Sequence, residues 1–167
     1  MKHKSRRLSR QWALQILCQA EARMLPLQQQ TAVVSDTTAD GLSPADKQQL
    51  HELTRLFFSH YSQTPQPDPY CLCLVDGVAD LLFRIDEILT HMSQGWKLSR
   101  MACVDRNVLR IAVYEMLFGP KLPKQVVMNE AIEVARQFGT SGSAAFVNGV
   151  LDALAHRHLK PDNQGMR

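Results

Sequence analysis

The chain has 167 residues, of which 45% are hydrophobic and 21% are charged. These fractions match those of globular proteins and exclude a chain that is disordered throughout. No apolar run approaches the roughly 20 residues of a membrane-spanning helix, and the basic N-terminus lacks the apolar stretch of a secretory signal. We therefore expect a cytoplasmic protein made of one domain, or of two small subdomains that share a core.

The cysteines do not have the spacing of a metal site. Cys18, Cys71, Cys73 and Cys103 include no CxxC pair and no combination with histidine that is typical of zinc ligands. In a reducing compartment such cysteines act as small buried hydrophobes. We predict no metal and no cofactor.

The net charge of +3 is unevenly distributed along the chain. Residues 1–25 hold six basic residues and one acidic residue, a balance of +5, whereas the remaining 142 residues have a balance of −2. A basic arm that leads into a helix is typical of nucleic-acid binding. A merely solvated arm, or an arm that binds an anionic membrane surface, are the alternatives that charge alone leaves open.

Helical spacing of apolar residues dominates the sequence, with no sustained alternation typical of strands. The first helix is predicted over 5–24. Arg6, Arg7 and Arg10 cluster at its start, where positive charge opposes the helix dipole. Because this placement is locally unfavourable, it favours a partner for the arginines. Residues 25–43 are predicted to form a long loop.

Two further helices begin with the same signal. Ser43-Pro44 and Asp68-Pro69 each place a capping side chain before a proline at the first helical position. The predicted helices run over 44–61 and 69–92.

The C-terminal part contains three more predicted helices with short connections. The first two cover 104–118 and 124–138. The last is capped by Ser141 or Ser143 and runs to about residue 158, and the tail 159–167 is expected to be disordered. The wide apolar stripe of the first of these suggests a central helix with neighbours on several sides. An all-α helical bundle, or two three-helix bundles packed together, is the predicted architecture.

No catalytic constellation is found. The turn 139–142 is Gly-rich but no lysine follows it, and none of the six histidines lies in a metal-ligand motif. Glu130 and Glu133 are neighbours on one helix face, and the nearby Arg136 indicates a salt-bridged surface instead of an acid–base pair. We predict that the protein is not an enzyme.

Several residues in the predicted helices are assigned structural roles. Arg110 belongs to a row with an i, i+4 spacing that indicates an arginine–carboxylate link between helices. Asn148 is expected to hydrogen-bond a neighbouring helix, and Gly149 to permit close approach of another backbone. The full structural set is Arg110, Tyr114, Glu115, Asn129, Glu130, Asn148 and Gly149.

Three ordered segments resemble motifs of the bacterial transcription antitermination factor NusB family. They are 104–117 (VDRNVLRIAVYEML), 123–139 (PKQVVMNEAIEVARQFG) and 143–152 (SAAFVNGVLD). The basic opening 6–10 (RRLSR), followed by 13–17 (ALQIL), resembles the start of that family. Cys18 departs from the pattern, because the family often has an aromatic residue there.

This resemblance implies a fold and a set of partners. The fold is all-α, with about six to seven helices in two three-helix subdomains packed together. The whole chain, 1–167, forms a single RNA-binding domain with an N-terminal part, 1–62, and a C-terminal part, 68–158. The implied ligand is single-stranded boxA RNA, bound together with NusE, a small-subunit ribosomal protein. The implied assembly contains other Nus factors and RNA polymerase and no membrane, and a homodimer is conceivable.

The expected RNA contacts lie at two places. Basic side chains of the N-terminal arm neutralise phosphates, and the start of the last helix offers backbone N–H groups and an aromatic ring. Phe146 either belongs to the core or forms a platform on which a base stacks. Helices between about 70 and 104 are expected to bind NusE. Two alternatives are a protein-only interaction module and a NusB-like domain related to RNA methyltransferases without their catalytic part. The RNA-binding set is Lys2, Lys4, Arg6, Arg7, Arg10, Ser143 and Phe146.

Overall fold

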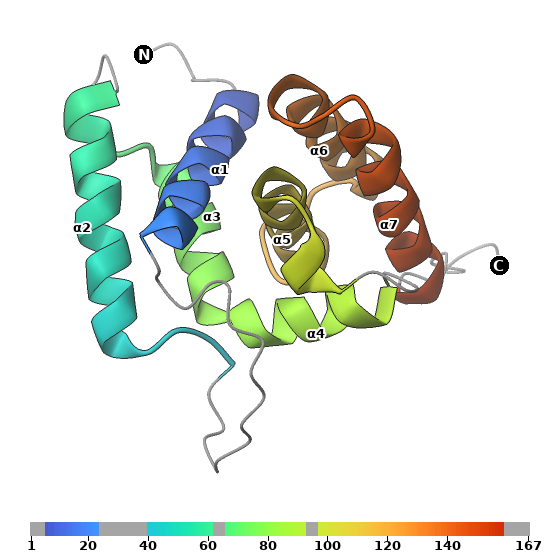
Figure 1. Cartoon of the computed structure of the whole chain (residues 1–167), viewed down its shortest axis with the longest axis horizontal. Helices are drawn as coiled ribbons and strands as arrows, with labels where there is room; N and C mark the ends of the chain where they lie inside the picture. The colour runs from blue at the N-terminus through green and yellow to red at the C-terminus, as the bar shows by residue number, and fades with distance from the viewer. Residues whose placement is uncertain (1–5, 24–39, 62–65, 93–96, 159–167) are drawn as a thin grey trace, which may run out of the picture.

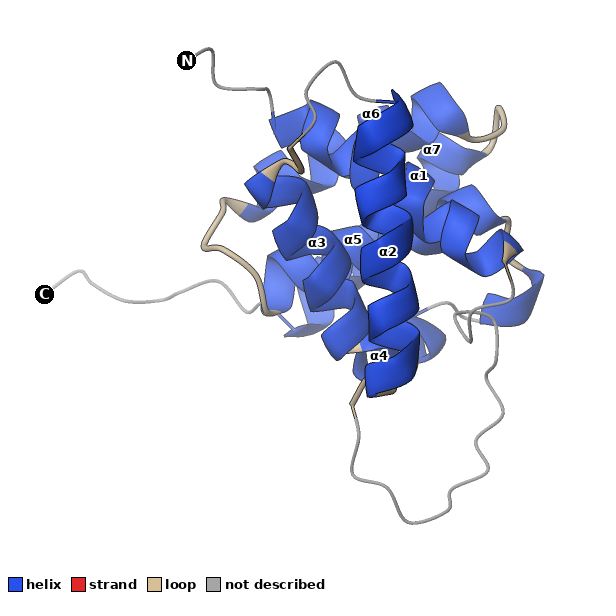
Figure 2. Cartoon of the chain, turned by 90° about the vertical axis from the view of Figure 1, so that its left-hand side faces the viewer, coloured by secondary structure: helices blue, strands red, loops and turns tan. Residues whose placement is uncertain are grey.

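The computed structural model describes residues 6–23, 40–61, 66–92 and 97–158. Within these ranges the chain forms seven α-helices and one short 3-10 helix, without strands (Figure 2). The all-α prediction is confirmed. The elements are α1 (Arg6–Ala22), α2 (Pro44–Tyr61), α3 (Pro69–Asp80), α4 (Leu82–Met92), η1 (Leu98–Arg100), α5 (Cys103–Leu117), α6 (Lys124–Phe138) and α7 (Ser143–His158).

The helices form two groups of three that share one core. Figure 1 shows α1, α2 and α3 on one side, α5, α6 and α7 on the other, and α4 along the bottom. The predicted pair of three-helix subdomains is therefore present. Helix α3, which the sequence placed in the C-terminal part, packs against α1 and also against α5.

Helix α5 is the central helix of the fold. It packs against α1, α3, α4, α6 and α7, and its buried side includes Leu109 and Val113, both fully buried. Each such side chain contributes about 1.5–3 kcal/mol by leaving water. The wide apolar stripe of this segment thus had the predicted consequence of contacts on several sides.

Both predicted helix starts are confirmed by their capping hydrogen bonds. The backbone N–H of Asp46 donates to Ser43 Oγ at 3.2 Å, and the N–H of Cys71 donates to Asp68 Oδ1 at 2.9 Å. Each bond satisfies one of the free donors in the first turn of a helix. These local signals place α2 and α3 where the sequence predicts them.

The single helix predicted over 69–92 is wrong, because the chain breaks at Leu81. A continuous helix would join the Phe83 N–H to the Ala79 carbonyl. Instead, Phe83 N–H donates to the Asp40 carbonyl at 2.9 Å, and the Leu42 N–H donates to Ala79 at 2.8 Å. The backbone of 40–42 is thus inserted into the helical ladder and satisfies both freed groups.

Gly41 makes this insertion sterically feasible. A Cβ atom at that position would collide with the carbonyl oxygen of Asp80. The break therefore depends on a segment about forty residues upstream, which no periodicity within 69–92 encodes.

Two predicted features lie outside the described residues: most of the loop 25–43 and the tail 159–167. Among the helices that the structure describes, none combines the length and apolar character needed to cross a membrane.

Candidate nucleic-acid interface

The start of α1 presents two arginines at the surface. Arg6 lies over the ring of Tyr70, with its guanidinium carbon 5.1 Å from the ring centroid. Arg7 donates from Nε and Nη2 to the Glu130 carboxylate at 2.9 and 2.6 Å, and 47% of its side chain remains exposed. The hydrogen bond and the charge of Glu130 raise the pKa of Arg7. Both arginines are thus held on α1 while remaining in contact with solvent.

The other members of the basic arm differ in position. Lys2 and Lys4 lie outside the described residues. Arg10 is only 3% exposed, and its Nε and Nη2 donate to the Glu115 carboxylate at 2.8 and 2.7 Å. Tyr70 Oη donates to the same carboxylate. The Nε and Nη2 donors of Arg10 are thus turned inward, so the structure does not present Arg10 at the surface where a phosphate contact was expected.

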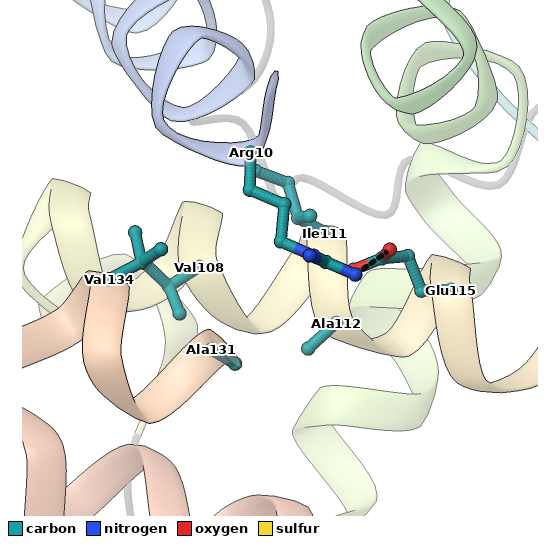
Figure 3. Close-up of a pocket in the computed structure, with 7 residues that line it drawn as sticks. All are labelled: Arg10, Val108, Ile111, Ala112, Glu115, Ala131 and Val134. Atoms are coloured by element: carbon teal, nitrogen blue, oxygen red, sulfur yellow. Dashed lines mark hydrogen bonds and ion pairs between the residues drawn. The ribbon is translucent and has the colours of Figure 1, made fainter. Parts of the chain in front are cut away.

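A small cavity lies beside the Arg10–Glu115 pair, between α1, α5 and α6. Figure 3 shows the pair at its edge, with the apolar side chains of α5 and α6 around it. Its volume of about 10 Å³ corresponds to the room of one water molecule. This space does not admit a small-molecule ligand.

The turn between α6 and α7 lies at the same end of the bundle as the start of α1 (Figure 1). Gln11 Nε2 on α1 donates to Gln137 Oε1 on α6 at 2.7 Å, so the end of α6 is fastened beside α1. The turn follows directly, and Thr140, Ser141 and Gly142 are exposed. The arginines and this turn therefore form one exposed edge, made of segments more than a hundred residues apart.

Ser143 shapes the turn instead of facing outward. Its side chain is buried at 1% exposure, and its Oγ accepts the N–H of Thr140 at 2.9 Å. A Cβ atom on Gly139 would collide with it. The hydroxyl expected to contact RNA thus lies inside the turn in this structure.

Phe146 lies in the first turn of α7 and is half-buried against the core. Part of the ring faces solvent next to the exposed turn. The sequence left two alternatives for Phe146, a core residue or a platform for base stacking, and its partial burial lies between them.

Three residues assigned structural roles are exposed instead. Asn148 makes no hydrogen bond to a neighbouring helix among the described residues, and an added Cβ on Gly149 would meet nothing within 4 Å. Asn129 is exposed on α6. The reasons given for Asn148 and Gly149 therefore find no support: both residues are exposed on α7, and the space beside Gly149 is open.

The remaining residues of the structural set connect helices. Arg110 donates to Asp86 at 2.8 and 2.7 Å and to Glu21 at 2.7 Å, which joins α5 to α4 and α1. The ring of Tyr114 occupies the space beside Gly77, where a Cβ would collide with it. Glu115 binds Arg10 and Glu130 binds Arg7, so both carboxylates connect α1 to the C-terminal helices. Arg136 bonds Glu133 on the surface of α6.

Sequence reasoning missed Glu21, the carboxylate at the centre of the buried charge cluster. Glu21 accepts from Arg106 Nη2 at 2.6 Å, from Arg110 Nη1 at 2.7 Å and from Asn107 Nδ2 at 3.1 Å, and it is 1% exposed. Burial acts to raise its pKa, but the bonds and charges of the two arginines outweigh burial and lower it. One signal was present: Glu21 is the only acid of residues 1–25, and it follows Leu17 by one helical turn.

Comparison with known proteins identifies close relatives by sequence. A model of the NusB family matches residues 60–156. Transcription antitermination protein NusB of Solibacter usitatus is 36% identical over 158 residues, which cover 95% of this chain and 93% of that protein. Transcription antitermination protein NusB of Desulforapulum autotrophicum is 43% identical over 122 residues, 72% of this chain and 84% of that protein.

Solved structures agree with the fold. NusB of T. maritima shares 30% identity with a TM-score of 0.68, and the match covers 94% of each chain. A chain in the crystal structure of antitermination factors NusB and NusE in complex with dsRNA is 20% identical, with a TM-score of 0.65, over 90% of this chain and 96% of that one. At this identity the second likeness concerns the fold alone.

Proposed function

The chain belongs to the NusB family of transcription antitermination proteins, and from that premise we propose that it binds boxA-type single-stranded RNA together with NusE. The observation that carries this proposal is the exposed edge described above. It combines two surface arginines of α1 with the exposed α6–α7 turn, and basic side chains at an exposed surface are what binding to the phosphate backbone of RNA requires.

Arg6 and Arg7 are proposed to bind phosphates. Guanidinium groups donate several hydrogen bonds in a fixed plane, which suits phosphate oxygens. Arg7 exchanges the Glu130 carboxylate for a phosphate, and the exchange is feasible because the pair is exposed and therefore weakly held. Lys2 and Lys4 add two more charges from the arm that precedes α1.

The start of α7 is proposed to complete the site. The helix has 16 residues, and its first backbone N–H groups point toward the exposed turn. Phe146 offers the exposed part of its ring for stacking with one base, and base–aromatic stacking contributes about 1–3 kcal/mol. Phosphate and base contacts would thus come from different helices.

The partners follow from the family. We propose that NusE binds across the helices between about 70 and 104, where Phe83 on α4 is a large hydrophobic residue with 45% exposure. The assembly would contain other Nus factors and RNA polymerase in the cytoplasm, and the protein would act by binding and not as an enzyme. The curated relatives carry names of antitermination proteins, which supports this part of the proposal.

Fluorescence anisotropy with labelled RNA tests the function. A boxA-like single strand and a scrambled strand of equal length are titrated with the protein, with and without equimolar NusE. We expect preference for the boxA-like strand and tighter binding with NusE. If about four phosphates are neutralised, log K falls against log salt with a slope of about −3.

The arginine contribution is tested with a double variant, Arg6→Gln with Arg7→Gln, which should weaken binding to both strands. Arg55→Gln is the matched control, since Arg55 is an exposed arginine on α2 that bonds Glu52 in the same two-pronged way. Equal, weak binding to both RNAs, with NusE still bound, would instead support the protein-only module. RNA binding that is unchanged in the double variant would refute the role of the arginines.

A further inference from the structure

Two cysteines from different helices meet beside the buried charge cluster. Cys18 lies on α1 and Cys103 is the first residue of α5, and both are half-buried free thiols. Asn107 Nδ2 lies 3.7 Å from Cys18 Sγ and 3.4 Å from Cys103 Sγ. Both sulfur atoms therefore lie within 4 Å of the same amide nitrogen.

The two thiols are chemically unequal. The nearby Cys103 thiol and the Asn107 amide lower the pKa of Cys18, although burial opposes this. The interaction with Cys18 and burial raise the pKa of Cys103. A thiol with a lowered pKa next to a second thiol is the arrangement in which the first attacks and the second resolves.

The other two cysteines lack this arrangement. Cys71 is buried on α3, and burial raises its pKa. Cys73, two residues later on the same helix, points elsewhere and has its sulfur 3.6 Å from Tyr114 Oη. The chain thus offers one paired site and two separated cysteines that serve as internal controls.

We propose that Cys18 and Cys103 form a reversible disulfide that joins α1 to α5, with a small disulfide such as oxidised glutathione as the oxidant. Because both Sγ atoms lie within 4 Å of Asn107 Nδ2, side-chain rotation toward each other is the main movement that the proposal requires. The function is a thiol-modification site, separate from the RNA edge at the other end of α1.

The reaction proceeds by two exchanges. The Cys18 thiolate attacks one sulfur of oxidised glutathione, so that a Cys18–glutathione disulfide forms, the glutathione disulfide breaks, and one glutathione leaves as thiolate and takes up a proton. The Cys103 sulfur, after losing its proton, then attacks Cys18 Sγ and expels the second glutathione. The protein dithiol is oxidised by two electrons, and one glutathione disulfide is reduced to two thiols.

The disulfide would alter the protein mechanically. It closes the chain between residues 18 and 103 and so limits the unfolded ensemble, which shifts the urea midpoint of the oxidised protein upward. Arg6 and Arg7 lie three turns away on α1, so the affinity for RNA is expected to stay within twofold. A stability change without an RNA change separates this site from the proposed function.

Thiol counting and peptide mapping test the proposal on the full chain. The reduced protein has four cysteines. After equilibration with oxidised glutathione, we expect two free thiols and a mapped Cys18–Cys103 linkage, which dithiothreitol reverses. Four remaining thiols, a glutathione adduct that does not resolve, or a linkage between other cysteines would overturn the proposal.

Variants identify which two cysteines form the disulfide. Cys18→Ser and Cys103→Ser should each abolish the internal disulfide, whereas the double variant Cys71→Ser with Cys73→Ser should retain it. Circular dichroism confirms that each variant is folded, and the mapping of the unmodified chain decides the question if one variant does not fold. Disulfide formation that persists without Cys18 would contradict the assignment.

Discussion

Both ends of α1 form arginine–carboxylate ion pairs, but the pair at its start is exposed to solvent and the cluster at its end is buried. At its start, Arg7 and Glu130 form an ion pair whose side chains are 47% and 19% exposed. At its end, Glu21 lies at 1% exposure between Arg106 and Arg110. An exposed pair is weak and exchangeable, whereas a buried pair that loses one partner leaves an uncompensated charge. One helix therefore has an end suited to binding and an end that anchors it.

Arg10 marks the point along α1 at which the arginines change from exposed to buried. It follows Arg6 by one helical turn, and both contact the ring of Tyr70, at 5.1 Å for Arg6 and 5.7 Å for Arg10. Arg6 is exposed and Arg10 is buried on Glu115. The basic cluster read from the sequence is thus divided by burial, and only part of it is available to a ligand.

The largest expected effect comes from the anchoring end. Glu21→Gln removes the negative charge that compensates Arg106 and Arg110, so we expect the free energy of unfolding to fall by about 4 kcal/mol. Urea denaturation measures the change. Glu52→Gln, in an exposed pair on α2, is the control and should have little effect. Similar losses in the two variants would contradict the comparison.

Arg10→Met tests the boundary between the two ends. The variant leaves the buried Glu115 without its cation, and we expect the free energy of unfolding to fall by about 3 kcal/mol. RNA affinity of the protein that remains folded should be almost unchanged, as measured by anisotropy below the unfolding temperature. A large loss of affinity in a stable variant would indicate that Arg10 contacts the RNA.

Acid should weaken the anchoring end of α1. The lowered pKa of Glu21 in the folded protein means that its contribution to stability is complete above its ordinary pKa, about 4.5, and is lost as the pH falls through the lower, folded value. Urea denaturation between pH 7 and pH 3 should show this loss for the unmodified chain and a flatter profile for Glu21→Gln. Parallel profiles would assign the acid sensitivity to other carboxylates.

The smallest effect on stability is expected at the binding end. Arg7→Gln breaks an exposed pair, so the urea midpoint should hardly move. The same change removes one phosphate contact, and the slope of log K against log salt should become about 0.7 less steep. Arg55→Gln should change neither quantity. An unchanged slope in Arg7→Gln would mean that Glu130 keeps Arg7 from the RNA.

The sequence by itself determined the helices and the family. Capping residues such as Ser43 and Asp68, and apolar positions at helical spacing, are local signals, because a helix closes its hydrogen bonds within four residues. The predicted boundaries of α6 and the predicted end of α7 accordingly match the structure. The motifs of the C-terminal half identified the family for the same reason: they are contiguous in the chain.

The tertiary structure alone decided which charges are buried and where one helix becomes two. Arg10 and Arg7 have similar local sequence, and only the packing of α5 and α6 against α1 buries one and exposes the other. The break at Leu81 requires the backbone of 40–42, and the meeting of Cys18 with Cys103 requires α1 to lie on α5. Burial and proximity depend on residues distant in the chain, and no local pattern encodes them.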